Sequence, residues 1–387
     1  MRRRLVHVTT TDMSLELLLG PQLSAFVDAG YEVIGASAPG RYVEAIEARG
    51  VEHLPLAHAT RSMAPRHDAA AFGELWKRFR EYRPDIVHTH NPKPGVYGRL
   101  AARAAGVPAI VNTVHGLYAM PDDPVGKRAV VYTLERLAAA ASHAELVQNL
   151  EDVPTLRSLH IPARKLTVLG NGVDLQRFRP DRLSSPARLA RRAEWGLGPD
   201  DVVCGAVGRL VWEKGYRELF GAARSLRTTH PNLHFVVIGG LDAAKPDQLG
   251  PADLEAIGHE ANIHFLGLRD DVEDLYGAMD LFVLASHREG FPRAAMEAAA
   301  SGLPVIATDI RGCRQVVEPM INGVLVPVAE IDPLAAAISQ LATDAARRRA
   351  MGVAAIEKSH KEFDDRRVIA TTLATYDRLC SHRSTRP

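Results

Sequence analysis

The chain has few cysteines and lacks long apolar runs. Cys204, Cys313 and Cys380 are widely separated in 387 residues, without the paired spacing of a zinc site or the even count of a secreted disulfide framework. No run of about 18 apolar residues occurs, so no membrane-spanning helix is expected. The basic start, MRRRLVHVTT, is followed by too short an apolar stretch for a signal peptide. We therefore expect a cytoplasmic protein. This expectation is compatible with peripheral association with the inner face of the cell membrane.

The sequence also lacks an excess of charge of either sign. Lysine and arginine total 47 against 46 acidic residues, a formal net charge of +1. This balance gives nucleic acid no general attraction, so no nucleic-acid partner is expected and any basic recognition must be local. Hydrophobic residues make up 46% and charged residues 24%, which is typical of a folded globular protein. At roughly 150 residues per domain, the length predicts two domains.

Short β-rich runs alternate with helical patterns along most of the chain. The alternation runs from LVHVTT at residue 5 to KLTVLG at 165, stops in a segment rich in arginine, proline and serine, and restarts with VVCGAVGRL at 202. Because this alternation builds parallel sheets, we expect two Rossmann-like, doubly wound α/β domains that face each other across a ligand cleft. The predicted divisions are residues 1–175, a linker at 176–200, residues 201–360, and a final helix at 361–387 that crosses back to the first domain.

One loop of the second half has the composition of a phosphate site. The fingerprints G-x-x-x-x-G-K-[ST] and G-x-G-x-x-G after the first strand are absent, which disfavours a P-loop kinase or a dehydrogenase. In GRLVWEKGY, Gly208 permits a tight turn, and Arg209 and Lys214 bring positive charge. The helix that starts near Gly215 adds free N–H groups, so a diphosphate could be neutralised there without a metal. The alternative is two ordinary surface cations beside a turn.

Two carboxylates follow in SHREGFPRAAMEAAASG. Glu289 ends a strand-to-helix loop, and Glu297 lies within the next helix. At about 1.5 Å per residue they lie at most roughly 12 Å apart, the span from a hexose hydroxyl across a diphosphate to a ribose. Each could hold one end of a sugar nucleotide, although Glu297 alone would also suit a solvated helix position. The separation exceeds the roughly 5 to 9.5 Å of glycosidase carboxylates. Asp270 and Asp271 fit a helix N-cap, and no metal site is expected.

The first half also places polar side chains where predicted strands end. His115 in NTVHG lies at a strand end and is favoured as a functional residue, whereas His88 lies within a strand, as a core histidine would. Lys93 follows the strand that ends in HTH. Arg61 and Arg66 are two cations on a predicted loop facing the same cleft. Solvated surface charge is the alternative for both arginines.

Taken together, these motifs resemble the retaining glycosyltransferases of family 4, which have the GT-B fold. The resemblance rests on GRLVWEKGY, EGFPRAAME, NGVLVP and NGVD, and it covers nearly the whole chain. The first half, with TTTDMSLELLLGPQL, TRSMAPRHD, HTHNPKPG and NTVHG, is more loosely similar to the branch that builds bacterial capsular and exopolysaccharide repeat units.

The resemblance implies roles for the donor-side residues. Arg209 and Lys214 would hold the donor diphosphate, and Glu297 would take the ribose hydroxyls. Glu289 and the backbone of the next two residues would contact the donor sugar, with His115 over the sugar near the reacting carbon. The implied catalytic set is His115, Arg209, Lys214 and Glu289. The implied donor-binding set is Gly208, Arg209, Lys214, Glu289, Gly290, Phe291 and Glu297.

The first loop departs from the family pattern. Many relatives have a glycine-rich loop there, but this sequence has TTTD, ending at Asp12, and its first following glycine is Gly20. The acceptor-side candidates are Asp12, Arg61, Arg66 and Lys93.

The sequence therefore predicts a retaining, metal-independent glycosyltransferase with no cofactor. It would move a hexose-type sugar from a nucleoside-diphosphate sugar to an acceptor hydroxyl, expected to belong to a lipid-linked glycan or another cell-envelope precursor. Two alternatives stay open. A GT-B sugar-nucleotide epimerase would need no acceptor, and a noncatalytic sugar-nucleotide-binding subunit would share the same donor contacts.

Overall fold

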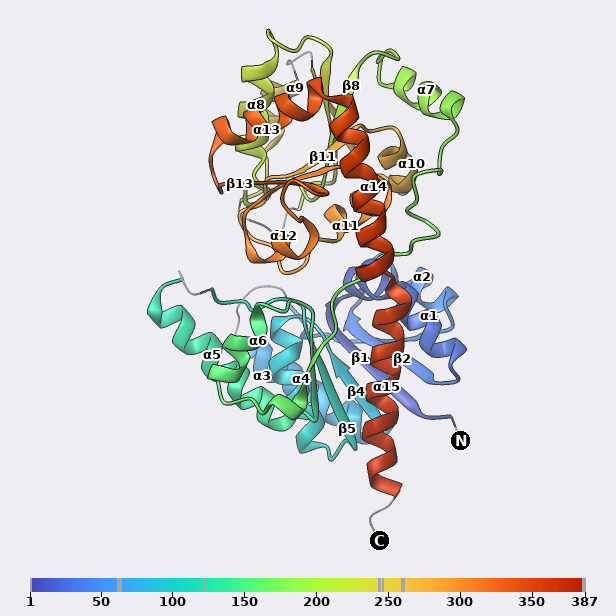
Figure 1. Ribbon diagram of the computed structural model, residues 1–387. Coiled ribbons are helices and arrows are strands. Elements are labelled where there is room, and N and C mark those ends of the chain that lie inside the picture. Colours follow the sequence, from blue (N-terminus) through green and yellow to red (C-terminus); the bar gives the residue numbers. More distant parts are fainter. Residues whose placement is uncertain are drawn as a thin grey trace. The chain divides into compact units, whose positions relative to one another are not determined.

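The chain folds into two compact units (Figure 1). Residues 1–170 and 366–387 form the first unit, and residues 171–365 form the second. This computed structural model describes residues 2–60, 65–120, 123–242, 245, 247–258 and 262–384. Among the helices formed by these residues, none combines the length and the apolar character needed to cross a bilayer.

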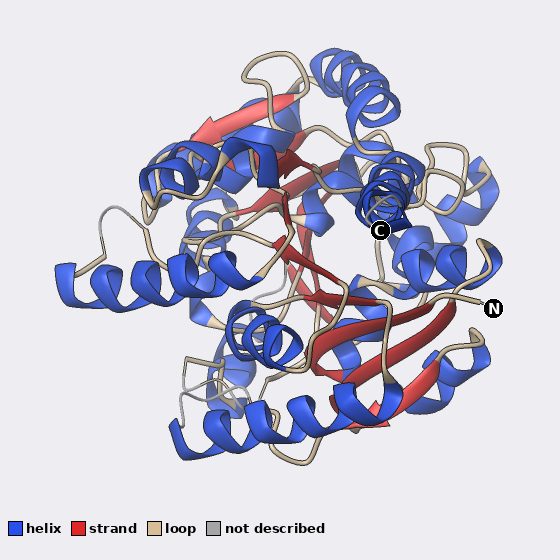
Figure 2. Cartoon of the chain, turned by 90° about the horizontal axis from the view of Figure 1, so that it is seen from below, coloured by secondary structure: helices blue, strands red, loops and turns tan. Residues whose placement is uncertain are grey.

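The first unit contains a seven-stranded parallel sheet with strand order β3-β2-β1-β4-β5-β6-β7. Its strands are β1 (Arg4–Thr11), β2 (Glu32–Ala38), β3 (Glu52–Pro55), β4 (Ile86–Thr89), β5 (Ala109–Val114), β6 (Ala144–Val147) and β7 (Leu166–Val168). Its helices are α1 (Gly20–Asp28), α2 (Val43–Ala48), α3 (Pro65–Tyr82), α4 (Pro92–Ala104), α5 (Val125–Ala141), α6 (Asp152–Ser158) and α15 (Asp365–Ser384), with short η1 (Ser14–Leu18) and η2 (Ala163–Lys165) turns. Figure 2 shows helices on both faces of these strands.

The second unit contains a six-stranded parallel sheet with strand order β10-β9-β8-β11-β12-β13. Its strands are β8 (Val202–Val207), β9 (Leu233–Ile238), β10 (Ile263–Gly267), β11 (Leu281–Leu284), β12 (Val305–Thr308) and β13 (Gly323–Val326). Its helices are α7 (Ser185–Glu194), η3 (Trp212–Lys214), α8 (Tyr216–Leu226), α9 (Pro251–Gly258), α10 (Val272–Gly277), α11 (Arg293–Ala300), α12 (Arg311–Val316), α13 (Ile331–Thr343) and α14 (Ala345–Glu362).

Burial on both faces explains why the strands read as nearly continuous apolar runs. In β1, Leu5 joins the core on one face of the sheet, and Val6 and Val8 join the core on the other. In each sheet the strand order reverses once, between β1 and β4 in the first unit and between β8 and β11 in the second. Open α/β sheets bind ligands at such switch points, outside the carboxyl ends of the strands. The two doubly wound sheets confirm the predicted fold class.

The arginine-rich segment at 176–200 belongs to the second unit. The guanidinium of Arg192 is buried, and its Nη2 lies 2.6 Å from an Asp280 oxygen. Arg188 pairs with the other oxygen of the same carboxylate at 2.7 Å. These two ion pairs hold α7 against the chain that leads into β11.

The final helix, α15, belongs to the first unit. Tyr376 is fully buried, and its hydroxyl lies 2.5 Å from Nδ1 of His88 in β4. Ile369, Leu373 and Leu379 pack against the same core, which also contains Leu5 and Phe26. The last segment of the chain therefore completes the first hydrophobic core.

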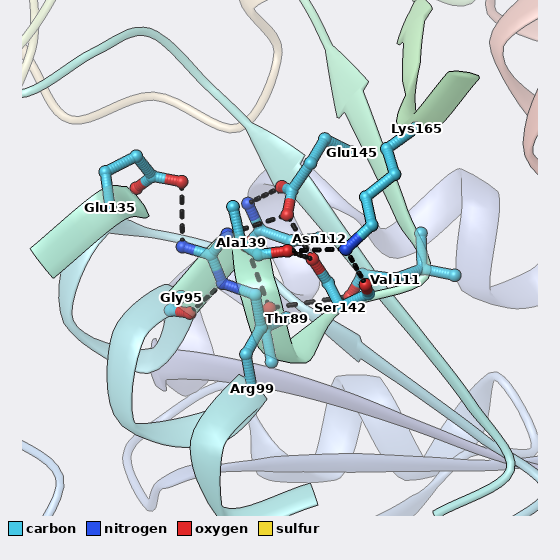
Figure 3. A network of polar contacts seen from close by, with 10 residues as sticks. All are labelled: Thr89, Gly95, Arg99, Val111, Asn112, Glu135, Ala139, Ser142, Glu145 and Lys165. Carbon is cyan, nitrogen blue, oxygen red and sulfur yellow. Dashed lines mark hydrogen bonds and ion pairs between the residues drawn. The ribbon is translucent and has the colours of Figure 1, made fainter. Parts of the chain in front are cut away.

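A buried ionic network crosses the interior of the first unit (Figure 3). Arg99 of α4 and Glu145 of β6 are both fully buried, and Nη1 of Arg99 donates to Glu145 at 2.8 Å. Nη2 of Arg99 donates to Glu135 of α5 at 2.9 Å. Glu145 also accepts a hydrogen bond from Asn112 at 2.8 Å and one from Ser142. The network joins two helices and two strands through a carboxylate that has three donors.

Candidate functional site

The loop after β8 approaches the end of β11 very closely. Gly215 has φ of 74°, and a Cβ there would lie 1.9 Å from the carbonyl oxygen of Ala285. Only glycine fits both the left-handed backbone and this approach. Gly208 begins the loop, and its carbonyl accepts a hydrogen bond from the hydroxyl of Tyr216 at 3.0 Å. The predicted phosphate loop therefore lies at the switch point of the second sheet.

Across that switch point, the structure brings Lys214 and Glu289 together. Nζ of Lys214 lies 2.5 Å from Oε1 of Glu289, which also accepts a hydrogen bond from Ser286 at 2.8 Å. The start of α12 fixes the backbone of Glu289, because a Cβ at Gly312 would lie 2.7 Å from its carbonyl oxygen. Arg209 instead pairs with Asp242 at 2.7 Å, with its side chain 46% exposed. Sequence patterns singled out neither Ser286 nor Asp242.

Glu297 is held by side chains of its own unit rather than solvated. Its side chain is 14% exposed. Oε2 accepts a hydrogen bond from Tyr276 at 3.2 Å, and Oε1 lies 3.6 Å from Nη2 of Arg293. These contacts disfavour an ordinary solvated helix position for this glutamate. Between the two glutamates, Gly290 and Phe291 continue the loop, and the carbonyl of Phe291 accepts a hydrogen bond from Asn171 at 3.2 Å.

In the first unit, His115 ends a chain of three histidine rings. Its Nδ1 lies 3.1 Å from the side-chain oxygen of Gln148, and its Nε2 lies 3.0 Å from Nδ1 of His90. Nε2 of His90 lies 2.9 Å from Nδ1 of His7. Since the amide oxygen can only accept, each ring in turn donates through Nδ1. Burial lowers the pKa of His115 to about 4 and that of His7 to about 3, so both rings are neutral at neutral pH.

His88 lies next to this chain and is buried, as expected of a core histidine. Its Nδ1 bonds Tyr376, and its Nε2 lies 2.8 Å from the hydroxyl of Thr113. Ring nitrogens of His7, His88 and His90 lie within 4.8 Å of one another, which is metal-ligand spacing. Hydrogen bonds occupy both nitrogens of His88, to Tyr376 and Thr113, and both nitrogens of His90, to His7 and His115.

Asp12 organises the loop that departs from the family pattern. Its two oxygens accept hydrogen bonds from the backbone N–H groups of Met13 at 2.8 Å and Tyr42 at 2.7 Å. Its carboxylate packs so closely on the following loop that a Cβ at Gly40 would lie 2.6 Å from it. In this structure Asp12 ties the loop after β1 to the loop after β2.

The three predicted acceptor-side cations differ in their surroundings. Nζ of Lys93 lies 2.5 Å from Asp68 and donates to the carbonyl of Thr60 at 2.9 Å. Arg66 lies exposed in the first turn of α3. Arg61 lies outside the described residues.

Comparison with known proteins gives the family. Residues 22–177 match the family model described as Glycosyltransferase Family 4, and residues 188–358 match that of Glycosyl transferases group 1. The UDP-Gal:alpha-D-GlcNAc-diphosphoundecaprenol alpha-1,3-galactosyltransferase of Escherichia coli is 31% identical over 280 residues, which cover 72% of this chain and 71% of that protein. The chain belongs to the family 4 glycosyltransferases. The family predicted from the sequence motifs is confirmed.

Other relatives of this glycosyltransferase span nearly its whole length. The N,N'-diacetylbacillosaminyl-diphospho-undecaprenol alpha-1,3-N-acetylgalactosaminyltransferase of Campylobacter jejuni is 25% identical, over 93% of this chain and 94% of its own. Among solved structures, sucrose-phosphate synthase from Thermosynechococcus elongatus matches with a TM-score of 0.82 at 20% identity, over 98% of this chain and 100% of its own. That likeness concerns the fold alone, which is GT-B in this glycosyltransferase, as the sequence predicted.

Proposed function

We propose that this glycosyltransferase is a retaining, metal-independent enzyme that transfers a hexose-type sugar from a nucleoside-diphosphate sugar to a lipid-linked glycan. The observation that carries the donor half is the pairing of Lys214 with Glu289 across the β8/β11 switch point. A cation and an acid at that place match the two needs of a sugar diphosphate, a positive partner for phosphate and an acceptor for sugar hydroxyls.

The chemistry follows from these groups. As the bond from the sugar to the diphosphate breaks, charge grows on the leaving oxygen, and Lys214, the exposed Arg209 and the N–H groups at the start of α8 would stabilise it. The acceptor hydroxyl would attack the anomeric carbon from the leaving-group face, so the configuration would be retained. A phosphate oxygen of the leaving group would take the proton of that hydroxyl. His115 would contact the donor sugar as a neutral ring.

The acceptor half rests on the printed names of the relatives. The proteins from Escherichia coli and Campylobacter jejuni are both named for sugar transfer to a diphosphoundecaprenol-linked sugar. We propose an acceptor of the same class, a polyprenyl-diphosphate sugar presented at the inner face of the membrane, with Arg66 among the residues that meet its diphosphate. The fork of an arginine suits such a group.

The direct test is transfer of labelled sugar from a panel of nucleotide sugars to a polyprenyl-diphosphate sugar and, in parallel, to soluble sugars. A nucleotide sugar that raises the melting temperature identifies the donor to be tried first. Transfer to the lipid-linked acceptor supports both halves of the proposal. Efficient transfer to a soluble sugar overturns the acceptor half. Release of an altered free sugar without any acceptor would indicate an epimerase instead.

The proposed cation cluster predicts activity without a divalent metal. Lys214 and Arg209 would supply the positive charge that a metal brings to the diphosphate elsewhere, so excess chelator should leave the initial rate within about twofold. The measurement is the rate of nucleoside-diphosphate release. The control reaction contains the same chelator already saturated with calcium. A collapse that magnesium or manganese restores would contradict the proposal.

Replacing Glu297 by alanine should weaken binding of the bare nucleoside diphosphate. Its carboxylate would accept ribose hydrogen bonds, and losing them should cost about 1.5 to 3 kcal/mol of binding free energy, as for hydrogen bonds to a charged group. Calorimetry with the nucleoside diphosphate measures this loss. Glu289→Ala should retain nearly full affinity for that ligand while turnover falls. Glu357→Ala, an exposed glutamate of α14, is the matched control. Unchanged affinity of the Glu297 variant would remove the ribose role.

A further inference from the structure

Helix α5 of the first unit leaves large apolar side chains exposed to solvent. Surface helices turn an apolar stripe inward and charged side chains outward. Between residues 129 and 140 of α5, the exposed positions are Ala129, Val130, Thr133, Leu134, Arg136, Leu137 and Ala140. Val130, Leu134 and Leu137, spaced four and three residues apart, lie on one side of the helix and are 56%, 37% and 56% exposed. Arg136 is the one charge among these exposed positions.

Two other charged side chains of α5 have partners within the first unit. Glu135 binds the buried Arg99 at 2.9 Å, and Lys127 pairs with Asp123 at 2.7 Å. The hydroxyl of Tyr132 donates to the carbonyl of Ala119 at 3.2 Å. The buried residues of the helix are Ala138, Ala139 and Ala141, so its covered side is lined by small side chains. The larger side chains, Val130, Leu134 and Leu137, are the ones left to solvent, and such a group of exposed apolar side chains is typical of an interaction surface.

A basic pocket lies at the carboxyl end of the same helix. It has a volume of about 470 Å³ and is formed partly by Ala140 and Ala141 of α5. Four cations line it, and no acidic residue does: Arg103, Arg164, Lys165 and Arg378. Nζ of Lys165 is already used, because it donates to the carbonyls of Ala139 at 2.8 Å and Ser142 at 2.6 Å.

Arg103, Arg164 and Arg378 differ from Lys165 in their contacts. In the part of the chain that the structure describes, none of their side chains forms an ion pair or a hydrogen bond. Burial lowers the pKa of Lys165; the carboxylate of Glu145 opposes this shift, and the neighbouring Arg164 and Arg103 add to it. The pocket therefore has the charge and the free donors to bind an anion.

The pocket is separate from the loops proposed to meet substrates. Ser142 and His143, which line it, come directly before β6, and Lys165 comes directly before β7. His115 and Lys93 follow the carboxyl ends of their strands. Because all strands of this sheet are parallel, the pocket lies at the opposite edge of the sheet from those residues. The cluster is thus a second basic site.

We propose that α5 docks the first unit on an anionic membrane, with Val130, Leu134 and Leu137 inserted among the lipids and a phospholipid phosphate bound in the basic pocket. This inference rests on the proposed function, because an enzyme with a lipid-linked acceptor must reach a membrane. An apolar helix face flanked by cations suits an anionic bilayer. A second copy of this chain would bring the same apolar face and no acid for the arginines. Free phosphate would leave the apolar face uncovered.

Co-sedimentation with vesicles tests the proposal without donor or acceptor. The wild type should bind vesicles of phosphatidylcholine mixed with phosphatidylglycerol and should bind vesicles of phosphatidylcholine alone much less. Val130→Asp combined with Leu134→Asp should lower binding by more than about tenfold, because two apolar side chains no longer enter the lipid. Arg103→Ala and Arg164→Ala should each lower binding to the anionic vesicles by about fivefold.

Val353→Asp, an exposed apolar position on α14 of the second unit, is the matched control and should bind as the wild type does. Melting temperatures establish that the variants are folded. Equal binding by the wild type and the α5 variant would overturn the proposal, as would self-association that the α5 variant abolishes. Protection from thermal unfolding by inorganic phosphate, lost in the arginine variants while vesicle binding persists, would assign the pocket to free phosphate. Donor affinity, measured separately, reports on the proposed function alone.

Discussion

Lys214→Ala is expected to lower turnover by roughly two to three decades, the range for removing one donor from a site that stabilises developing negative charge. Lys214 lies 2.5 Å from Glu289 at the switch point of the second sheet, where the donor diphosphate is proposed to bind. Without its ammonium group, the charge on the leaving diphosphate would lose its nearest fixed partner. The measurement is the initial rate at saturating donor and acceptor, which separates turnover from binding.

Two further variants give this experiment its controls. Lys361→Ala removes an exposed lysine of α14 and should leave the rate unchanged. Lys214→Arg keeps the charge but changes its shape, and it should recover part of the lost rate. If Lys214→Ala turns over as fast as the Lys361 variant, the positive charge for the leaving group comes from elsewhere.

Arg99→Ala should destabilise the first unit by about 3 to 5 kcal/mol, because it leaves a buried carboxylate without its cation. Glu145 is fully buried and would keep only the hydrogen bonds from Asn112 and Ser142. The free energy of unfolding can be followed in urea through the fluorescence of Trp76 in α3. The other two tryptophans, Trp195 and Trp212, belong to the second unit and would first be replaced by phenylalanine.

A charge-free replacement separates the ion pair from simple loss of packing. Arg99→Met combined with Glu145→Leu removes both charges and should cost much less than Arg99→Ala alone. Lys77→Ala, which breaks an exposed pair with Glu81, should change stability by less than about 1 kcal/mol. An Arg99→Ala variant as stable as the Lys77 variant would mean that water or another cation reaches Glu145.

Sequence periodicity predicted the fold class because a strand buried on both faces must be apolar along its length. β1 is such a strand, and the LVHVTT run identified it. The segment at 176–200 shows the limit of composition. Its arginines and prolines indicated a linker, but Arg188 and Arg192 pair with Asp280, far away in the sequence. No local pattern contains that partner.

For the candidate site, too, the sequence predicted the loops but not the contacts between them. The loops that carry Lys214 and Glu289 could be found from their glycines and charges, but their contact joins residues 75 positions apart. The hydrogen-bonded rings of His7, His90 and His115 come from three strands or strand ends, so only their pairing in the sheet brings them together. For α5, periodicity alone does not tell which face of a helix the rest of the fold covers.

The place of α15 has a consequence for how the protein is made. Its residues are synthesised after those of the second unit, yet Tyr376 fills the first core beside Phe26 and bonds His88. Until α15 is made and docked, the first unit therefore lacks part of its core, whereas the residues of the second unit have already been made. During that interval the amino-terminal half is open to chaperones and proteases, because domains fold as units while translation continues. Stop codons that remove only the last turns of α15 should for this reason lower the amount of protein recovered from cells, even though every residue assigned to the donor is present.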